Sequence, residues 1–125
     1  MKYVLAFVSP DRFDHLVEEF ADHHVRGLSI SEARGFGQEH DPGHPDHRSH
    51  PTVDLVKKLR LEIVCRNEEV EDILAALYKA AHTGRRGDGK VFVMEVLEAF
   101  RLKTGERGEG ALGPPSTPKR GAPPS

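Results

Sequence analysis

The feature that most constrains the fold of this chain is a strand–helix–strand pattern that occurs twice with similar spacing. In the first half, residues 2–8 and 28–34 have the character of strands, and apolar residues at helical spacing lie between them. The second half repeats this order, with strands expected at 59–63 and 91–97. Two such units predict an α+β fold, the ferredoxin-like βαββαβ sandwich of helices on a sheet.

Apolar patterning places the strand at 2–8 and both helices against a core. The strand has apolar side chains on both faces, which suits burial on both sides. Ser9 and Pro10 are expected to begin the first helix, since Pro needs no N–H at the first helical position. Asn67 is expected to cap the second helix. The buried stripes are predicted to hold Phe13, Leu16, Val17 and Phe20 in the first helix, and Val70, Ile73, Leu74 and Leu77 in the second.

Two segments are too polar to contribute to a core. Residues 38–52 contain three prolines, four histidines and almost nothing apolar, so a long exposed loop is expected between the second and third strands. From 109 to 125 glycine, proline and serine dominate, which predicts a disordered tail. The folded domain is therefore expected to span residues 1–108.

Charge and composition argue against several classes of protein. The formal net charge is -2 with both signs interspersed, which gives no basic surface for nucleic acid. Cys65 is the only cysteine, so no intramolecular disulfide can form, and we expect it to be a buried packing residue of a strand. The apolar run at the N-terminus, about six residues, is shorter than a signal-peptide core or a membrane span. We expect a cytoplasmic protein without direct membrane insertion.

Residues 83–90 form a glycine-rich turn with the chemistry of a phosphate cradle. Glycines let backbone N–H groups point inward, while Arg85, Arg86 and Lys90 supply positive charge. An ordinary helix-to-strand turn is the alternative, because glycine-rich loops are weakly specific. Walker and Rossmann loops run from strand to helix, the reverse of this turn, so kinase, ATPase and dehydrogenase functions lose their support. The sequence also offers no nucleophile–base pair in a recognisable context, so we expect no enzyme.

Three strings of sequence resemble a known family. They are Gly35-Phe36-Gly37 before the long loop, Thr83-Gly84 followed by Gly87-Asp88-Gly89-Lys90-Val91-Phe92-Val93, and Arg101-x-Lys103-Thr104-Gly105-Glu106 after the last strand. In these strings the chain resembles the PII signal transduction family, from residue 1 to about 110. The T-, B- and C-loops of that family correspond to residues about 37–55, 82–90 and 101–108.

The resemblance implies a non-catalytic regulator that forms a homotrimer and binds ATP or ADP in clefts between its subunits. The residues implied at the nucleotide are Gly87, Asp88, Gly89 and Lys90 of one subunit, Arg101 and Lys103 of its neighbour, and Ser29, Gly35 and Gly37 at the border. Lys103 stands where the family commonly has arginine, which keeps the charge but loses the bidentate fork. The T-loop is expected to control a target transporter or enzyme in nitrogen regulation.

The T-loop departs from the family pattern. Glu39 stands where well-studied members carry a glutamine that helps to hold Mg²⁺ and 2-oxoglutarate. A carboxylate suits Mg²⁺ but repels the doubly anionic oxoacid. Lys58 is retained at the position that pairs with the far carboxylate of the oxoacid, so 2-oxoglutarate binding stays open. Pro51 replaces the tyrosine that many relatives carry, so uridylylation is not expected there.

A histidine-rich run in the T-loop supports an alternative function. His40, His44, His47 and His50 recur at spacings of three and four, with carboxylates between them. Such ligands suit Zn²⁺ or another transition metal, as in a metal-responsive PII-like regulator linked to heavy-metal efflux. A solvated loop without a physiological ligand, or pH sensing through imidazole charge, stays open as well. His82 borders the B-loop, where it either approaches the nucleotide or packs within the turn.

Overall fold

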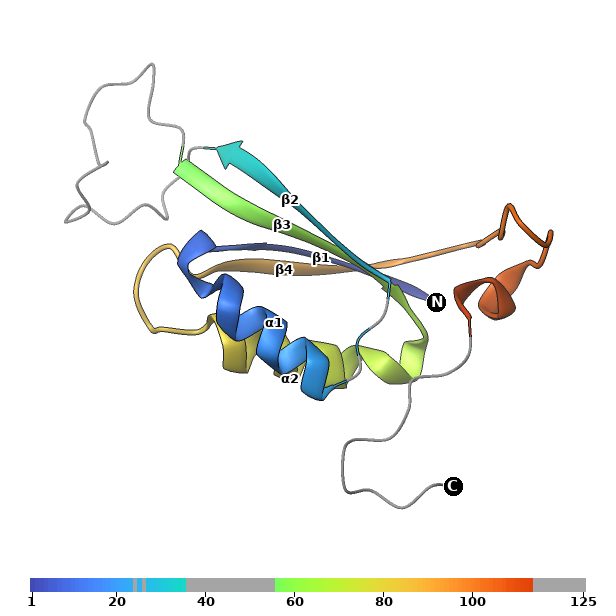
Figure 1. The fold of residues 1–125 in the computed structure, drawn as a ribbon, viewed down its shortest axis with the longest axis horizontal. Coiled ribbons are helices and arrows are strands. Elements are labelled where there is room, and N and C mark those ends of the chain that lie inside the picture. The colour runs from blue at the N-terminus through green and yellow to red at the C-terminus, as the bar shows by residue number, and fades with distance from the viewer. Residues whose placement is uncertain (24, 26, 36–55, 114–125) are drawn as a thin grey trace.

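The structure is a computed structural model that describes residues 1–23, 25, 27–35 and 56–113. In this part of the chain, strands and helices follow each other in the order β1, α1, β2, β3, α2, β4 (Figure 1). This order confirms the α+β, ferredoxin-like βαββαβ sandwich. The elements are β1 (Lys2–Val8), η1 (Pro10–Arg12), α1 (Phe13–Asp22), β2 (Leu28–Gly35), β3 (Val56–Cys65), η2 (Asn67–Glu69), α2 (Val70–Ala81), β4 (Gly89–Glu95) and η3 (Gly108–Leu112), where η marks a 3-10 helix.

The strands form one antiparallel sheet in the order β2-β3-β1-β4. Leu5, in the middle of β1, pairs with Glu62 of β3 on one side and with Phe92 of β4 on the other. Both helices lie against the same face of the sheet, and no described segment covers the opposite face (Figure 1). We call that second surface the open face.

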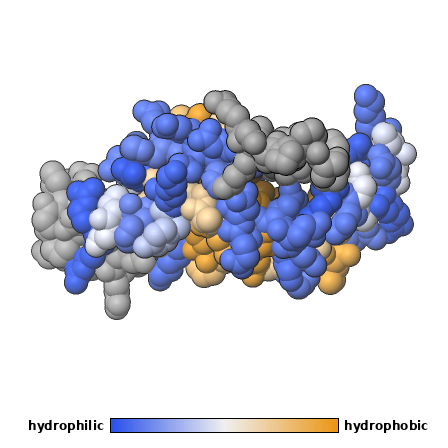
Figure 2. Space-filling view, turned by 90° about the horizontal axis from the view of Figure 1, so that it is seen from below, coloured by the Kyte–Doolittle hydropathy of each residue, from blue (hydrophilic) through white to orange (hydrophobic). Residues whose placement is uncertain are grey.

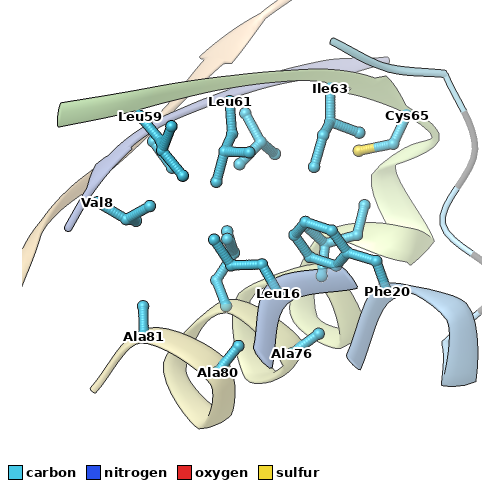
Figure 3. Packing of buried hydrophobic residues seen from close by; sticks show 14 residues of the cluster. Val8, Leu16, Phe20, Leu59, Leu61, Ile63, Cys65, Ala76, Ala80 and Ala81 are labelled. Carbon is cyan, nitrogen blue, oxygen red and sulfur yellow. The ribbon is translucent and has the colours of Figure 1, made fainter. Parts of the chain in front are cut away.

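The core fills the layer between the sheet and the helices. Figure 3 shows Leu61 and Ile63 of β3 pointing toward Leu16 and Phe20 of α1. Cys65 is buried in the same layer, which confirms its packing role, and burial raises the pKa of its thiol. The buried members are Val4, Ala6, Val8, Leu16, Phe20, Leu59, Leu61, Ile63, Cys65, Ile73, Ala76, Leu77, Ala80 and Ala81.

Ser9 and Pro10 are the N-cap and the first residue of a helical turn, as predicted, but the start of the second helix differs from the predicted cap. Asn67 is the first residue of η2 and not its N-cap; Arg66 precedes it, and the Arg66 backbone N–H donates to the Glu69 side chain at 2.9 Å. Ser9 does precede a helical turn, but its hydroxyl donates to the Asp11 carboxylate at 2.8 Å. In each case a 3-10 turn leads into the α-helix, and its tighter i to i+3 hydrogen bonds satisfy backbone N–H groups that a side-chain cap would otherwise serve.

The predicted apolar stripe of α1 is buried only along its centre. Leu16 and Phe20 are buried, whereas Phe13 and Val17 are 44% and 50% exposed. At about 100° per residue, Phe13 and Val17 lie about 40° and 80° from the line midway between Leu16 and Phe20. Both are on the same side of that line, toward one margin of the contact with the sheet. Within the described ranges, no helix has the length and apolar character needed to cross a membrane.

β1 is apolar on both faces, but the described chain covers only one of them. Its helix-facing side chains are fully buried, and those on the open face are half-buried. The buried set is Val4, Ala6 and Val8, and the open-face set is Tyr3, Leu5 and Phe7. The predicted burial of both faces is therefore not reached within a single described chain.

The chain continues beyond β4 into structure where the disordered tail was predicted to begin. Gly108–Leu112 form η3, so the expected boundary at residue 108 differs from the structure. The Arg66 guanidinium donates to the carbonyl oxygen of Gly113 at 2.7 Å, and that of Arg101 donates to the carbonyl oxygen of Ala111 at 3.2 Å. These contacts from distant residues hold a segment whose own composition is poor in apolar side chains. Residues 114–125 lie outside the described chain.

Candidate functional site

The B-loop is braced from within by Asp88. Its carboxylate accepts hydrogen bonds from the backbone N–H groups of Thr83 at 2.7 Å and Gly84 at 2.9 Å, and from the Thr83 hydroxyl. Burial opposes ionisation of this carboxyl, but these donors, together with nearby His82, outweigh burial and hold the pKa of Asp88 below its usual range. The turn between α2 and β4 is therefore a shaped structure with its own internal hydrogen bonds.

Two glycines allow the B-loop to enter β4. Gly89 has φ of +107°, and a Cβ at this position would lie 1.8 Å from the carbonyl oxygen of Phe7. Gly87 has φ of +93°, which residues with a side chain rarely adopt. Because Gly89 opens β4 opposite Val8, the backbones of β1 and β4 approach each other closely beside the loop.

Lys58 connects β3 to the B-loop. Its Nζ donates to the carbonyl oxygen of Gly87 at 2.6 Å, in a part-buried setting. The partners are 29 residues apart in sequence and belong to different elements. The residue that the sequence assigned to the oxoacid thus contacts the predicted phosphate cradle directly.

Gly35 and Ser29 occupy different levels of β2. Gly35 ends the strand at the same end of the molecule as the B-loop (Figure 1). A Cβ on Gly35 would meet no atom of the described chain within 4 Å, so packing inside this part of the chain does not require glycine. Ser29 lies six residues earlier, exposed and about 20 Å away along the strand, next to Glu62 of β3.

The C-loop segment, residues 101–108, which contains Arg101 and Lys103, lies at the opposite end of the molecule from the B-loop (Figure 1). The Arg101 guanidinium contacts the Glu106 carboxylate at 3.2 Å and the carbonyl oxygens of Gly110 and Ala111 at 3.3 and 3.2 Å. Lys103 is exposed. One described chain therefore brings together Lys58 and residues 87–90, but not the two C-loop cations.

Several predicted site residues lie outside the described residues. They are Gly37, Glu39, His40, His44, His47 and His50. Among the residues that the structure does describe, no group of three or more His, Cys, Asp or Glu side chains is arranged to hold a metal ion.

Sequence reasoning missed what the side chains around the B-loop do. Asp88 was assigned to the nucleotide, yet its carboxylate is engaged with Thr83 and Gly84. The spacing Thr-x-x-x-x-Asp within a tight turn is a signal that could have indicated such a brace. For His82, the ring stacks on Tyr78 at 4.5 Å, and its Nδ1 lies 3.7 Å from the Asp88 carboxylate. Of the two roles open for His82, the described contacts are those of a packing residue.

Comparison with known proteins finds similarity to a single family over nearly the whole chain. The family model described as "Nitrogen regulatory protein P-II" matches residues 1–106, which include the B-loop and most of the C-loop. The nitrogen regulatory proteins P-II of Azospirillum brasilense and Rhodospirillum rubrum are each 37% identical to this chain over 114 residues. That of Haemophilus influenzae is 37% identical over the same number of residues. In all three cases the similarity covers 90% of this chain and 100% of the relative.

Proposed function

The chain belongs to the nitrogen regulatory protein P-II family, whose members are signalling regulators and not enzymes, and we propose that it senses ATP or ADP. In this proposal the nucleotide occupies clefts between the subunits of a cytoplasmic homotrimer. The phosphates contact the backbone of Gly87, Asp88 and Gly89 and the side chain of Lys90, while Ser29, Gly35 and Gly37 border the nucleotide. The T-loop then engages or releases a target transporter or enzyme.

The observation that carries this proposal is the shaped B-loop. Backbone amides bind an anion well only when their direction is fixed beforehand, because ordering a flexible loop costs conformational entropy. The internal hydrogen bonds of Asp88 and the bond from Lys58 to Gly87 supply that fixed shape. Since the Asp88 carboxylate is engaged within the turn, we assign the contact of Asp88 with the phosphates to its backbone.

A second copy of the chain is needed to complete the site. Arg101 and Lys103 carry charge suited to phosphate, but the C-loop segment that contains them lies at the far end of the same chain from the B-loop (Figure 1). A head-to-tail arrangement that closes as a ring brings the C-loop of one copy to the B-loop of the next. Arg101 then exchanges some of its contacts with Glu106 and η3 for contacts with phosphate.

The open face of the sheet supports the trimer. Phe92 and Met94 of β4 are 48% and 44% exposed on this face, beside the half-buried Leu5 and Phe7 of β1. An antiparallel sheet with one face toward water carries mainly polar side chains there. Apolar side chains on the open face therefore favour its burial against other copies.

Lys58 gives a physical route between oxoacid and nucleotide. If 2-oxoglutarate pairs with Lys58, the bond from Lys58 to Gly87 must lengthen or be shared, which changes the B-loop. Glu39, which lies outside the described residues, is the proposed Mg²⁺ ligand and disfavours the oxoacid by charge repulsion. We therefore propose ATP or ADP as the main effector and 2-oxoglutarate as a weaker one.

The metal-responsive alternative gains no support from the described residues. Its ligands, His40, His44, His47 and His50, lie outside them, and the matching relatives are named for nitrogen regulation.

Calorimetric titration with ATP, with and without Mg²⁺ and 2-oxoglutarate, tests the proposed function. We expect saturable ATP binding with one site per chain, little enhanced by the oxoacid. Strong enhancement would show that Glu39 tolerates the oxoacid and that only the ranking of effectors is wrong. No heat and no competition for a fluorescent ATP analogue would contradict nucleotide sensing at residues 87–90.

A further inference from the structure

The segment that follows β4 exposes apolar side chains to solvent, and its backbone is held by hydrogen bonds. Leu97 and Leu102 are 94% and 90% exposed, and Phe100 is 56% exposed. Phe100 forms a bridge with Arg107, and Arg101 exchanges backbone hydrogen bonds with residues 105 and 106, each of 2.8 Å. We call residues 96–102 the C-terminal arm. Its apolar residues are held in place yet uncovered by the described chain, which is typical of a surface that packs on a partner.

A matching apolar groove lies between α2 and β4. It is lined on the helix side by Leu74, Leu77 and Tyr78 and on the strand side by Val91, with a volume of about 260 Å³. In Figure 2 the hydrophobic residues gather along the lower side of the view, whereas much of the surface facing the viewer is hydrophilic. Sites for drug-sized ligands measure about 300–1,000 Å³, so this smaller groove fits one or two side chains better.

Residues of α2 and of the B-loop together line the groove. Tyr78 is 66% exposed, and its ring stacks on that of His82, which also borders the groove. Gly89 and Lys90 line the same groove. An occupant of the groove therefore lies directly beside the predicted phosphate cradle.

We propose that Phe100 and Leu102 of one copy of the chain fill the α2–β4 groove of the next copy. This inference rests on the proposed homotrimer, in which Arg101 of one copy reaches the B-loop of its neighbour. Leu102 directly follows Arg101 in the chain, so its Cα lies within about 4 Å of that of Arg101. When Arg101 reaches the phosphates beside Lys90, Leu102 arrives next to the groove, which Lys90 also lines. In this arrangement the apolar contacts of Phe100 and Leu102 hold the guanidinium of Arg101 at the nucleotide site of the next copy.

Disulfide cross-linking between subunits tests this contact. A Tyr78→Cys, Leu102→Cys double variant is oxidised mildly and run on a non-reducing gel, with buried Cys65 retained throughout. The contact predicts covalent dimers and trimers that a reductant returns to monomer, because the arm and groove of different copies lie within disulfide range. The control variant pairs Leu102→Cys with Glu71→Cys, an exposed position about 10 Å further along α2, and is expected to stay monomeric on the gel.

Light scattering on the same unoxidised variants separates the possible failures. A trimer in solution that does not cross-link through position 78, or that cross-links equally through position 71, would overturn the docking of the arm and leave the proposed function intact. A monomer in solution would overturn the homotrimer, and the inference with it. ATP titration of the wild-type chain reports on nucleotide sensing independently of both.

Discussion

The Nζ of Lys58 and the carbonyl oxygen of Gly87 lie 2.6 Å apart and form a hydrogen bond that joins β3 to the B-loop. β3 begins at Val56, directly after the range predicted for the T-loop. The bond therefore connects the strand that follows the predicted T-loop to the proposed phosphate cradle, through a single side chain.

Replacing Lys58 by methionine removes this bond while keeping most of the aliphatic stem. We expect Lys58→Met to weaken ATP binding about 5- to 30-fold, because a hydrogen bond from a charged group contributes on the order of 1–2 kcal/mol when part-buried. Lys57→Met, at the exposed neighbouring position, is the matched control and should bind ATP as the wild type does. Equal affinities of the two variants in calorimetric titration would contradict the role of Lys58.

Glycine at position 89 is expected to be a structural requirement. Gly89→Ala places a Cβ against the carbonyl oxygen of Phe7 and forces β1 and β4 apart, so we expect a loss of stability of about 3 kcal/mol or more. Gly84 also has a positive φ, but a Cβ at this position would meet no described atom within 4 Å. We therefore expect Gly84→Ala to lower the stability by only about 1–2 kcal/mol. Urea denaturation measures both; a larger loss for Gly84→Ala would contradict the close approach of the two strands.

The brace at Asp88 predicts a pH dependence of stability. Its pKa in the folded protein lies below the ordinary value of 3.8, so the stabilisation is complete above that value and is lost as pH falls through the folded pKa. Asp88→Asn should cost about 1–3 kcal/mol near pH 7, since the Thr83 and Gly84 donors lose a charged acceptor. The stability difference from wild type should shrink below about pH 4. Glu18→Gln, at an exposed site of α1, controls for charge removal; a pH-independent difference at Asp88 would contradict the brace.

A charge on the open face and a charge on the helical side are expected to affect trimer formation differently. Phe92→Asp puts a charge in the proposed trimer interface and should give monomers in light scattering. Val17→Asp changes a similarly exposed residue on the helical side, at 50% exposure against 48%, and should leave the trimer intact. A trimeric Phe92→Asp variant would show that the open face is not the interface.

The sequence was sufficient to predict the layers of the fold and not the ends of its elements. The strand at 2–8 and the helix over 70–77 are both present in the structure. Their burial was predicted only in part, because one face of 2–8 is half-buried, and Ile73 and Leu77 are buried whereas Val70 and Leu74 are only partly so. The 3-10 turns at Ser9 and Asn67 were missed, because cap preferences do not distinguish an α-helical start from a tighter first turn.

The sequence predicted which residues of the B-loop belong to the candidate site, but it did not predict the contacts that hold them. The glycines of the B-loop are visible in the sequence, since few other residues tolerate positive φ. The bond from Lys58 to Gly87 and the bond from Arg66 to Gly113 join residues that are 29 and 47 positions apart in the chain, and nothing in local composition signals them. Such contacts follow from the strand order, which must be known first.

Complementation between subunits tests the central claim most directly, that the nucleotide site is shared by two copies of the chain. Lys90→Ala and Arg101→Ala are each purified as homotrimers, and the two chains are also co-expressed so that mixed trimers form. Each homotrimer lacks one half of every site, so both are expected to bind ATP weakly. In mixed trimers, some sites combine the intact B-loop of the Arg101→Ala chain with the intact C-loop of the Lys90→Ala chain.

We predict that calorimetric titration of mixed trimers from equal amounts of the two chains finds wild-type ATP affinity at about a quarter of the sites. Mixed trimers that bind no better than either homotrimer, with assembly confirmed by light scattering, would contradict a site that joins the B-loop of one copy to Arg101 of another.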